Sequence, residues 1–183
     1  MSTALPRPTE RLVLRDFEEA DWPQVHAYAS DPEVVRYMSW GPNSEEETRD
    51  FLRQKLEAQA ADPRAEFDLA VVLRDTARLI GACGITVSSA RTRCAWVGYC
   101  FHRDFWGQGY ATEAARAVAR FGFEALGLHR IFATCDTENL ASARVLEKLG
   151  MRREGHLRED TLARGRWRDS YLYAVLEQDW AGD

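Results

Sequence analysis

The stretch 104–127, "DFWGQGYATEAARAVARFGFEALG", decides the fold of this chain. Two glycines, Gly107 and Gly109, flank a glutamine, and an alanine-rich run with helical spacing begins directly after them. The first amides of a helix have no intrahelical acceptor, and the helix dipole makes that end positive. Because glycine adds no side chain and tolerates positive φ, the loop before this helix predicts a backbone site for an anion such as a diphosphate.

The helix predicted over 109–126 has small side chains on one face, which let its axis lie close to a sheet. That face holds Ala111, Ala114, Ala115, Val118, Gly122 and Ala125. Three strand patterns precede the helix, at 67–74, 78–88 and 94–102, and the short polar turns between them predict antiparallel neighbours. A strand at 129–136 follows the helix, so a crossover is predicted to join it in parallel to the 94–102 strand.

The N-terminal third predicts one strand and two helices. Alternation at 11–16 predicts the strand, and "EADWPQVHAYAS" has a helical pattern for which Asp21 or a neighbour is the candidate N-cap. A second helix starts at a capping box formed by Ser44 and Glu47 and is expected to end before Pro63.

The C-terminal part predicts a helix at 139–150, which Gly150 ends, and strands near 151–158 and 167–177 on either side of "DTLARGR". Antiparallel strands followed by a strand–helix–strand unit indicate one α+β domain over 1–183, with a mainly antiparallel sheet of about seven strands. Ligands of such sheets bind beyond the carboxyl ends of strands where the strand order switches, which is where the two glycines stand.

Composition argues against several classes of function. The net charge is −5 and the pI is about 5.5, so neither nucleic acid nor an anionic membrane is an expected partner. No apolar run reaches the roughly 18 residues of a membrane span. The four cysteines form no C-x-x-C pair and lie in apolar runs, which predicts buried thiols in a cytoplasmic protein. The four histidines are scattered, so no metal site is predicted.

Three phosphate-binding motifs are possible for the glycine stretch. The P-loop pattern G-x-x-x-x-G-K-[ST] is absent. A dinucleotide-binding G-x-G-x-x-G would use Gly107 and Gly109 and would favour an acidic residue such as Asp136 after the next strand, but Thr112 takes its third position. The longer connection before the helix and the preceding antiparallel strands also fit that motif poorly.

The third motif is carried by "WGQGYATEA" and, further on, "DTENLASARVLEKLG". Together they resemble the GNAT superfamily of acyl-CoA N-acyltransferases, whose signature Gln/Arg-x-x-Gly-x-Gly/Ala maps onto residues 106–111. Trp106 departs from its first position, which puts a side-chain contact there in doubt, and a "WGxGYATEA" form is usual in the branch of ribosomal-protein N-terminal acetyltransferases. The resemblance runs from "RLVLRDFEEAD" to "GRWRDSYLYAVLEQDW", almost the whole chain.

The resemblance implies a GNAT-type sheet with helices on both faces and a splayed parallel strand pair that binds coenzyme A, with acetyl-CoA as cosubstrate. The backbone at 100–102 would pair with the pantetheine arm, and the amides at 108–112 would hold the pyrophosphate. Asn139 would bind the arm or serve as a helix N-cap. The implied cofactor-binding residues are Cys100, Phe101, His102, Gly107, Gln108, Gly109, Tyr110, Ala111, Thr112, Asn139 and Ser142.

The implied reaction is direct transfer of acetyl from the thioester to a neutral amine. Ser142 is the candidate proton donor to the leaving sulfur, or else a helix residue that packs near the cofactor. Many relatives carry Glu in "A-E-I-G-Y", whereas this chain has "A-W-V-G-Y", and Trp96 cannot accept a proton. His102 becomes the candidate catalytic base, because histidine titrates near neutral pH, and Asp104 and Glu113 are its alternatives.

The acceptor side is expected to be walled by the first helices and the last hairpin. Tyr37, Trp40, Trp96 and Trp167 are the candidate substrate-binding residues, with core packing as their alternative role. A peptide N-terminus, a polyamine, an aminoglycoside and an amino acid all remain open as the amine, and the protein is expected to be a monomer or homodimer. The alternative function, motivated by Trp96, is a catalytically weak acyl-CoA-binding or regulatory module.

Overall fold

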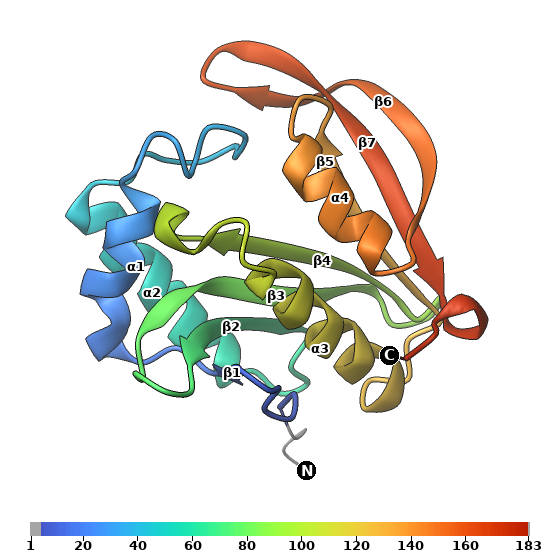
Figure 1. The fold of residues 1–183 in the computed structure, drawn as a ribbon, viewed down its shortest axis with the longest axis horizontal. Helices are drawn as coiled ribbons and strands as arrows, with labels where there is room; N and C mark the ends of the chain where they lie inside the picture. The colour runs from blue at the N-terminus through green and yellow to red at the C-terminus, as the bar shows by residue number, and fades with distance from the viewer. Residues whose placement is uncertain (1–4, 183) are drawn as a thin grey trace.

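The computed structural model describes residues 5–182 and contains one seven-stranded sheet with the order β1-β2-β3-β4-β5-β7-β6 (Figure 1). The strands are β1 (Leu12–Arg15), β2 (Glu66–Leu73), β3 (Leu79–Ser89), β4 (Cys94–Phe101), β5 (Arg130–Asp136), β6 (Arg152–Ala163) and β7 (Arg166–Leu176). The helices are α1 (Trp22–Ala29), α2 (Glu45–Gln59), α3 (Tyr110–Glu124) and α4 (Leu140–Lys148), with short 3-10 turns η1 (Glu19–Asp21), η2 (Arg103–Phe105) and η3 (Glu177–Asp179).

The sheet is antiparallel at every pairing except that of β4 with β5, which is parallel. Helix α3 connects these two strands, as its place between them in the sequence predicts. This confirms the α+β class and the mixed, mainly antiparallel sheet. The last hairpin is tighter than predicted, because β6 continues to Ala163 and only Arg164 and Gly165 separate it from β7.

Helices cover both faces of the sheet. One cluster of buried side chains lies between the sheet and α3 and α4, and a second lies between the sheet and α1 and α2. Side chains of a strand alternate between faces, so Leu69 joins the first cluster and Ala70 the second. Each face of the sheet therefore has its own buried core.

Helix α3 lies close to the sheet because its contact face is small, as predicted. Ala114, Ala115 and Val118 are fully buried. A Cβ on Gly122 would lie only 2.8 Å from the Cδ1 of Ile85, so no larger residue fits there without movement. Ala125 was predicted on this face but is exposed, because the helix ends one residue before it.

The helix ends follow local sequence signals. The Ser44 amide donates to the Glu47 carboxylate at 2.7 Å, and the Glu47 amide donates to the Ser44 hydroxyl at 3.2 Å, which confirms the predicted capping box. Gly150 follows the end of α4 with a φ of +76°, as a helix-ending glycine should.

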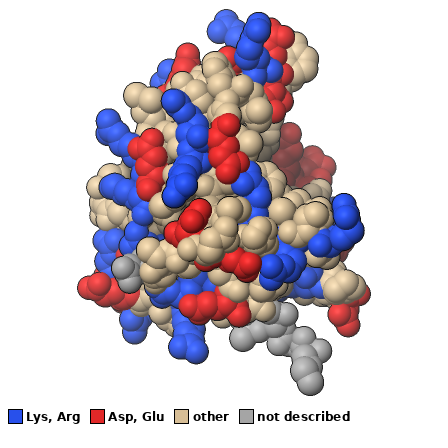
Figure 2. All heavy atoms as spheres, turned by 90° about the vertical axis from the view of Figure 1, so that its right-hand side faces the viewer, with Lys and Arg blue, Asp and Glu red and all other residues tan. Residues whose placement is uncertain are grey.

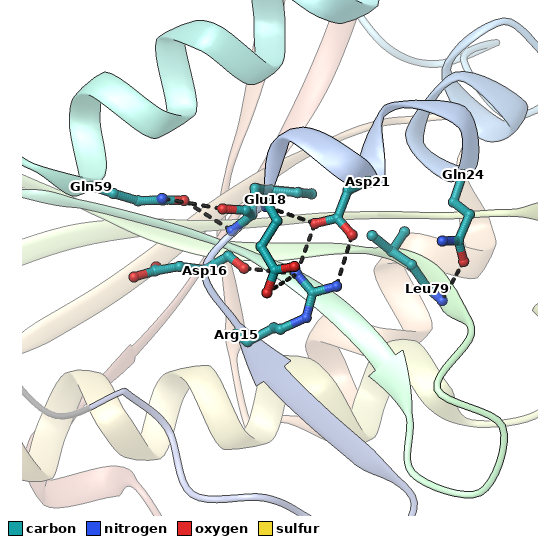
Figure 3. Close-up of polar contacts among 8 residues, drawn as sticks. Arg15, Asp16, Glu18, Asp21, Gln24, Gln59 and Leu79 are labelled. Carbon is teal, nitrogen blue, oxygen red and sulfur yellow. Dashed lines mark hydrogen bonds and ion pairs between the residues drawn. The ribbon is translucent and has the colours of Figure 1, made fainter.

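Asp21 or a neighbour was predicted to cap α1. Asp21 stands at the N-cap position, but its carboxylate makes no capping hydrogen bond to α1 and has other partners (Figure 3). It accepts from the Glu18 amide at 2.8 Å and from both Nη atoms of Arg15 at 2.7 Å. Only 3% of Asp21 is exposed. The Gln59 side chain of α2 accepts from the Phe17 amide at 2.9 Å. These contacts fix the chain between β1 and the helices on its face of the sheet.

The surface carries both signs of charge. Figure 2 shows basic and acidic side chains interspersed over the face that holds the right-hand side of Figure 1. No helix within residues 5–182 is long and apolar enough to cross a membrane. All four cysteines are free, but only Cys83 and Cys135 are buried, whereas Cys94 and Cys100 are partly exposed, so the prediction of four buried thiols was wrong for these two.

Candidate functional site

The parallel strands β4 and β5 separate after a short paired segment. Their register ends at Trp96 and Phe132, although β4 continues to Phe101 and β5 to Asp136. Figure 1 shows the two strands diverging from their paired ends at the right of the view. The backbone of β4 beyond Trp96 therefore faces an opening and not a neighbouring strand.

Strand alternation determines which backbone groups of β4 face this opening. The His102 amide donates to the Ile80 carbonyl at 2.9 Å, so the even-numbered residues of this part of β4 exchange hydrogen bonds with β3. Tyr99 and Phe101 consequently turn their backbone groups toward β5. The Phe101 carbonyl already accepts from the Trp106 indole at 2.8 Å. His102 and Cys100 were predicted to pair with a bound arm through their backbones. The Cys100 groups and the His102 amide instead face β3, and the His102 carbonyl accepts from the Phe105 amide at 3.0 Å.

A cavity of about 900 Å³ occupies the gap and reaches both faces of the sheet. From the side of α1 and α2 it is lined by Tyr28, Tyr37, Trp40 and Asp68, and from the side of α4 by Asn139 and Ser142. It thus joins a wide, aromatic chamber to the predicted position of the thioester. A volume of this order is that of a small-molecule site.

Three polar side chains meet on the α4 side of the gap. The Asn139 Oδ1 accepts from the Ser142 amide at 3.1 Å, so this residue caps α4. Its Nδ2 has no hydrogen-bond partner among residues 5–182 and is free for a ligand. The Tyr99 hydroxyl lies 2.9 Å from the Ser142 hydroxyl. Burial raises the pKa of Tyr99, so the phenol stays protonated and the two hydroxyls form a neutral pair.

The N-terminal end of α3 has the conformation that its glycines predicted. Gly107 and Gly109 have φ values of +74° and +84°, which other residues adopt only with strain. A Cβ on Gly107 would meet nothing within 4 Å, so this backbone is open to a ligand. Within the described part of the chain, the amides of residues 107–112 have no hydrogen-bond acceptor. The arrangement can hold a phosphate through main-chain N–H groups.

Arg11 lies beside this loop, although its position in the sequence gives no local signal of it. Its Nη1 donates to the Gln108 carbonyl at 3.0 Å, and its guanidinium lies over the Tyr110 ring at 4.3 Å. Its Nη2 also pairs with Glu113 at 2.6 Å. A positive side chain from the residue before β1 therefore stands at the predicted phosphate site, where Trp106 replaces the Gln or Arg of the signature.

Glu113 is held in place by the N-terminal segment. Its carboxylate accepts from the Thr9 hydroxyl at 2.6 Å and from the Arg11 amide at 3.0 Å. Burial acts to raise the pKa of Glu113, but these hydrogen bonds and the Arg11 charge outweigh it and lower the pKa. A carboxylate engaged in this way is ionised and structural, and it does not line the cavity, so it is a poor candidate for the base.

Glu113→Gln is expected to reduce the sensitivity of the protein to acid. The pKa of Glu113 is lower in the folded protein than in the unfolded chain. The ionised carboxylate therefore stabilises the fold at pH values above the unfolded-state pKa, and this stabilisation is lost as pH falls through the folded-state pKa. The variant should be less stable than wild type at pH 7 and should lose less stability on acidification. Thermal melting from pH 7 down to acidic pH tests this. Glu124→Gln, at an exposed position of the same helix, is the control. Parallel acid profiles for wild type and Glu113→Gln would contradict it.

The other predicted site residues divide into two groups. Tyr37, Trp40 and Trp96 line the cavity. Trp167 does not, and 60% of its surface is exposed near the tip of the last hairpin. His102 also lies outside the cavity lining, where its Nδ1 accepts from the Asp104 amide at 3.2 Å. The structure therefore separates this candidate base from the other predicted groups.

The last hairpin and the segment between α1 and α2 form one wall of the cavity. Arg164, in the hairpin turn, donates to the carbonyls of Val35 at 2.7 Å and Arg36 at 3.1 Å. Arg168, which lines the cavity, pairs with Asp136 and lies over the Tyr37 ring at 5.5 Å. Two parts of the chain that are distant in sequence thus shape the acceptor chamber together.

No thiol of the cavity is poised as a nucleophile. Burial raises the pKa of Cys100 to about 12 and that of Cys135 to about 11. Burial also raises the pKa of Cys83. Since the thiolate is the reactive form, these side chains are inert at neutral pH. Among the described residues, no group of three or more His, Cys, Asp or Glu could hold a metal ion.

Comparisons with known proteins agree with this geometry. Residues 11–152 match the family model described as an acetyltransferase (GNAT) domain. The chain is 38% identical over 172 residues to the uncharacterized N-acetyltransferase YnaD of Bacillus subtilis (strain 168), covering 94% of this chain and 97% of that protein. It is 26% identical over 182 residues to the ribosomal protein uS5-alanine N-acetyltransferase of Escherichia coli (strain K12), covering 94% and 91%.

A solved structure of similar sequence gives the same result for the fold. The acetyltransferase (GNAT family) from Bacillus anthracis superposes with a TM-score of 0.82 at 37% sequence identity. The match covers 92% of this chain and 96% of that one.

Proposed function

Because this chain belongs to the GNAT acetyltransferase family, we propose that it transfers the acetyl group of acetyl-CoA directly to a primary amine. The enzyme class, N-acetyltransferase, follows from the family. The observation that supports direct transfer is the gap between β4 and β5, because one cavity runs through it and reaches both faces of the sheet. A donor held along β4 and an amine held under α1 and α2 would meet there.

The residues present fit coenzyme A. Open main-chain amides around Gly109, the positive end of α3 and the nearby Arg11 favour a pyrophosphate. The unpaired backbone of Tyr99 suits the amides of a pantetheine arm, as an added strand would. The free Nδ2 of Asn139 faces the same gap and is the remaining polar group for the arm.

The chain supplies two functions to the reaction itself. Holding an amine and a thioester side by side contributes roughly 7–11 kcal/mol to lowering the barrier. The Ser142 hydroxyl donates a proton to the departing sulfur, and the Tyr99 hydroxyl, 2.9 Å away, can replace that proton. The raised pKa values of the cavity thiols argue against an acetyl-cysteine intermediate.

The acceptor is an amine that fits an aromatic chamber, either a protein N-terminus or a small molecule. One relative, the uS5-alanine N-acetyltransferase of Escherichia coli, acts on a ribosomal protein, which makes peptide N-termini the first class to test. The partly exposed Trp40 and Trp96 and the Tyr37 ring supply apolar walls with polar edges.

A screen of amines separates this function from its alternative. Thiol release from acetyl-CoA is measured with peptides of different first residues, polyamines, aminoglycosides and amino acids, and calorimetry measures coenzyme A binding separately. We expect at least one amine to support turnover above the rate of hydrolysis. Trp96 favours the alternative of an acyl-CoA-binding regulatory module, and tight coenzyme A binding without turnover of any amine would establish that alternative.

Ser142→Ala is expected to lower kcat by about 10²-fold, the low end of the usual effect of a general acid, and to leave KM for acetyl-CoA nearly unchanged. Tyr99→Phe should lower kcat less, because water can return the proton to Ser142. Steady-state kinetics with an amine from the screen measure both. Ser39→Ala is the matched control, since this hydroxyl lines the same cavity. A kcat of Ser142→Ala within twofold of wild type would remove the hydroxyl from the proton path.

A further inference from the structure

Asp68 on β2 lies in line with two glycines on the next two strands of the sheet. It stands opposite Gly84 on β3, which in turn stands opposite Gly98 on β4. A Cβ on Gly84 would lie only 2.0 Å from the Asp68 Oδ1, so the carboxylate occupies the space that this glycine leaves. The carboxylate therefore leans across β3 in the direction of β4.

These two glycines extend from Asp68 to β4, the strand that borders the gap between β4 and β5. Neighbouring strands lie about 4.8 Å apart, so the backbones of β2 and β4 are separated by about 10 Å. The Asp68 side chain spans the first interval by lying over Gly84, and the edge of the Trp96 ring lies over Gly98 in the second. Asp68, Trp96 and Gly98 all line the cavity, so a water or the acceptor nitrogen can reach the carboxylate beside the indole.

Asp68 approaches from the face opposite to the proposed proton donor. Even-numbered residues of this part of β2 face α1 and α2, as Ala70 does in their buried cluster. Ser142 belongs to α4, on the other face, and contacts the odd-numbered Tyr99. A thioester held in the gap would thus have a carboxylate on the amine side and a hydroxyl on the sulfur side.

Several titratable groups surround Asp68. Its Oδ2 lies 2.5 Å from the Lys55 Nζ of α2, which also pairs with Glu66. Tyr28 of α1 and Cys83 of β3 lie nearby, and burial raises the pKa of each, so both remain neutral at pH 7. Burial raises the pKa of Asp68 as well, although Lys55 draws it down. The environment is that of a carboxylate able to take up a proton and release it.

We propose that Asp68 is the general base of this enzyme, accepting a proton from the acceptor ammonium directly or through one water. This rests on the proposed function. The ammonium gives one proton to the Asp68 carboxylate, and the neutral nitrogen bonds to the acetyl carbon as the carbon–sulfur bond breaks. The sulfur takes a proton from Ser142, and the second nitrogen proton returns through the hydroxyl pair. Asp68 then releases its proton to water.

The assignment accounts for Trp96. Trp96 takes the position on β4 where, by the resemblance, a Glu would face the amine, and its indole lies on the same face of the sheet as Asp68. A Cβ on Gly98 would lie 2.8 Å from the Trp96 ring, so the ring covers the backbone there. The proton acceptor is thereby moved two strands away, and the indole becomes a wall of the amine chamber.

The test compares acceptors that need a base with one that does not. For Asp68→Asn, kcat with an alkyl amine from the screen should fall about 10²-fold at pH 7 and rise toward that of wild type as pH increases. With hydroxylamine, whose nitrogen is already neutral at pH 7, the variant should stay within threefold of wild type. KM for acetyl-CoA should not change. Asp16→Asn is the matched control, because Asp16 pairs with Arg64 at 2.7 Å as Asp68 pairs with a lysine, but does not line the cavity.

A second variant protects the test against misfolding. Asp68→Ala should show the same loss and recover activity with added formate, a small carboxylate that can enter the space. Equal losses with the alkyl amine and hydroxylamine, or no formate rescue in a folded variant, would assign Asp68 a structural role and overturn the proposal. A wild-type enzyme that turns over no amine would instead overturn the proposed function and this role with it, so the two failures differ.

Discussion

Gly109→Val is expected to bind coenzyme A about 10³-fold more weakly than the wild-type protein. The loop places Gly109 at a φ of +84°, a conformation that costs a β-branched residue about 1–3 kcal/mol. A loop that relaxes away from it withdraws the amides that face the phosphates. The loss of two charge-assisted hydrogen bonds, at about 2 kcal/mol each, corresponds to about 10³ in the dissociation constant.

Gly127→Val separates this loss from simple backbone strain. Gly127 also has positive φ, at +61°, and an added Cβ would meet nothing within 4 Å. It lies beyond the opposite end of α3, so the variant should lose stability by a similar amount and keep its affinity. Calorimetry with coenzyme A and thermal melting of both variants make the comparison. Unchanged affinity in Gly109→Val would exclude this loop as the phosphate site.

Arg15→Met is expected to lower the free energy of unfolding by about 3–5 kcal/mol, because it leaves the buried Asp21 carboxylate without its cation. The Asp21 side chain is only 4% exposed and pairs with Arg15 at 2.7 Å, so water cannot replace the guanidinium. Methionine retains the apolar stem of the arginine, which confines the change to the charge and its hydrogen bonds (Figure 3). Denaturant titration measures the difference.

Arg53→Met provides the matched comparison. Arg53 forms the same kind of pair with Asp50, but these side chains are 66% and 47% exposed. Exposed pairs contribute about 0–1 kcal/mol, so this variant should remain within that range of wild type. Similar losses in the two variants would mean that the Arg15 contact is no more than a surface pair.

Much of the fold was readable from local patterns. The strands around α3, the capping box at Ser44 and the helix-ending Gly150 all depend on residues close together in sequence, and the structure confirms them. The errors lie at element ends and at ambiguous caps. Asp21 has the residue type of an N-cap, but its carboxylate accepts hydrogen bonds from Arg15 and from the Glu18 amide and makes none to the amides of α1.

The site could be predicted only in part, because some of its residues are brought together by contacts between distant parts of the chain. The glycines before α3 predict an anion site from sequence, because glycine alone adopts positive φ readily and leaves the backbone amides uncovered. Arg11 reaches that loop from just before β1, and Asp68 reaches the gap from β2, through contacts that no local pattern specifies. His102 looked suitable by residue type, yet the structure holds it outside the cavity.

The sequence by itself determined the order of helices and strands, the parallel pair around α3 and the loop at its start, because periodicity, capping and glycine act over a few residues. Only the tertiary structure decided which backbone groups of β4 face the gap, since a shift of one residue in strand register exchanges the two sides. It also decided which charged side chains reach the cavity. These contacts join residues separated by tens of positions, and their geometry exists only once the sheet is assembled.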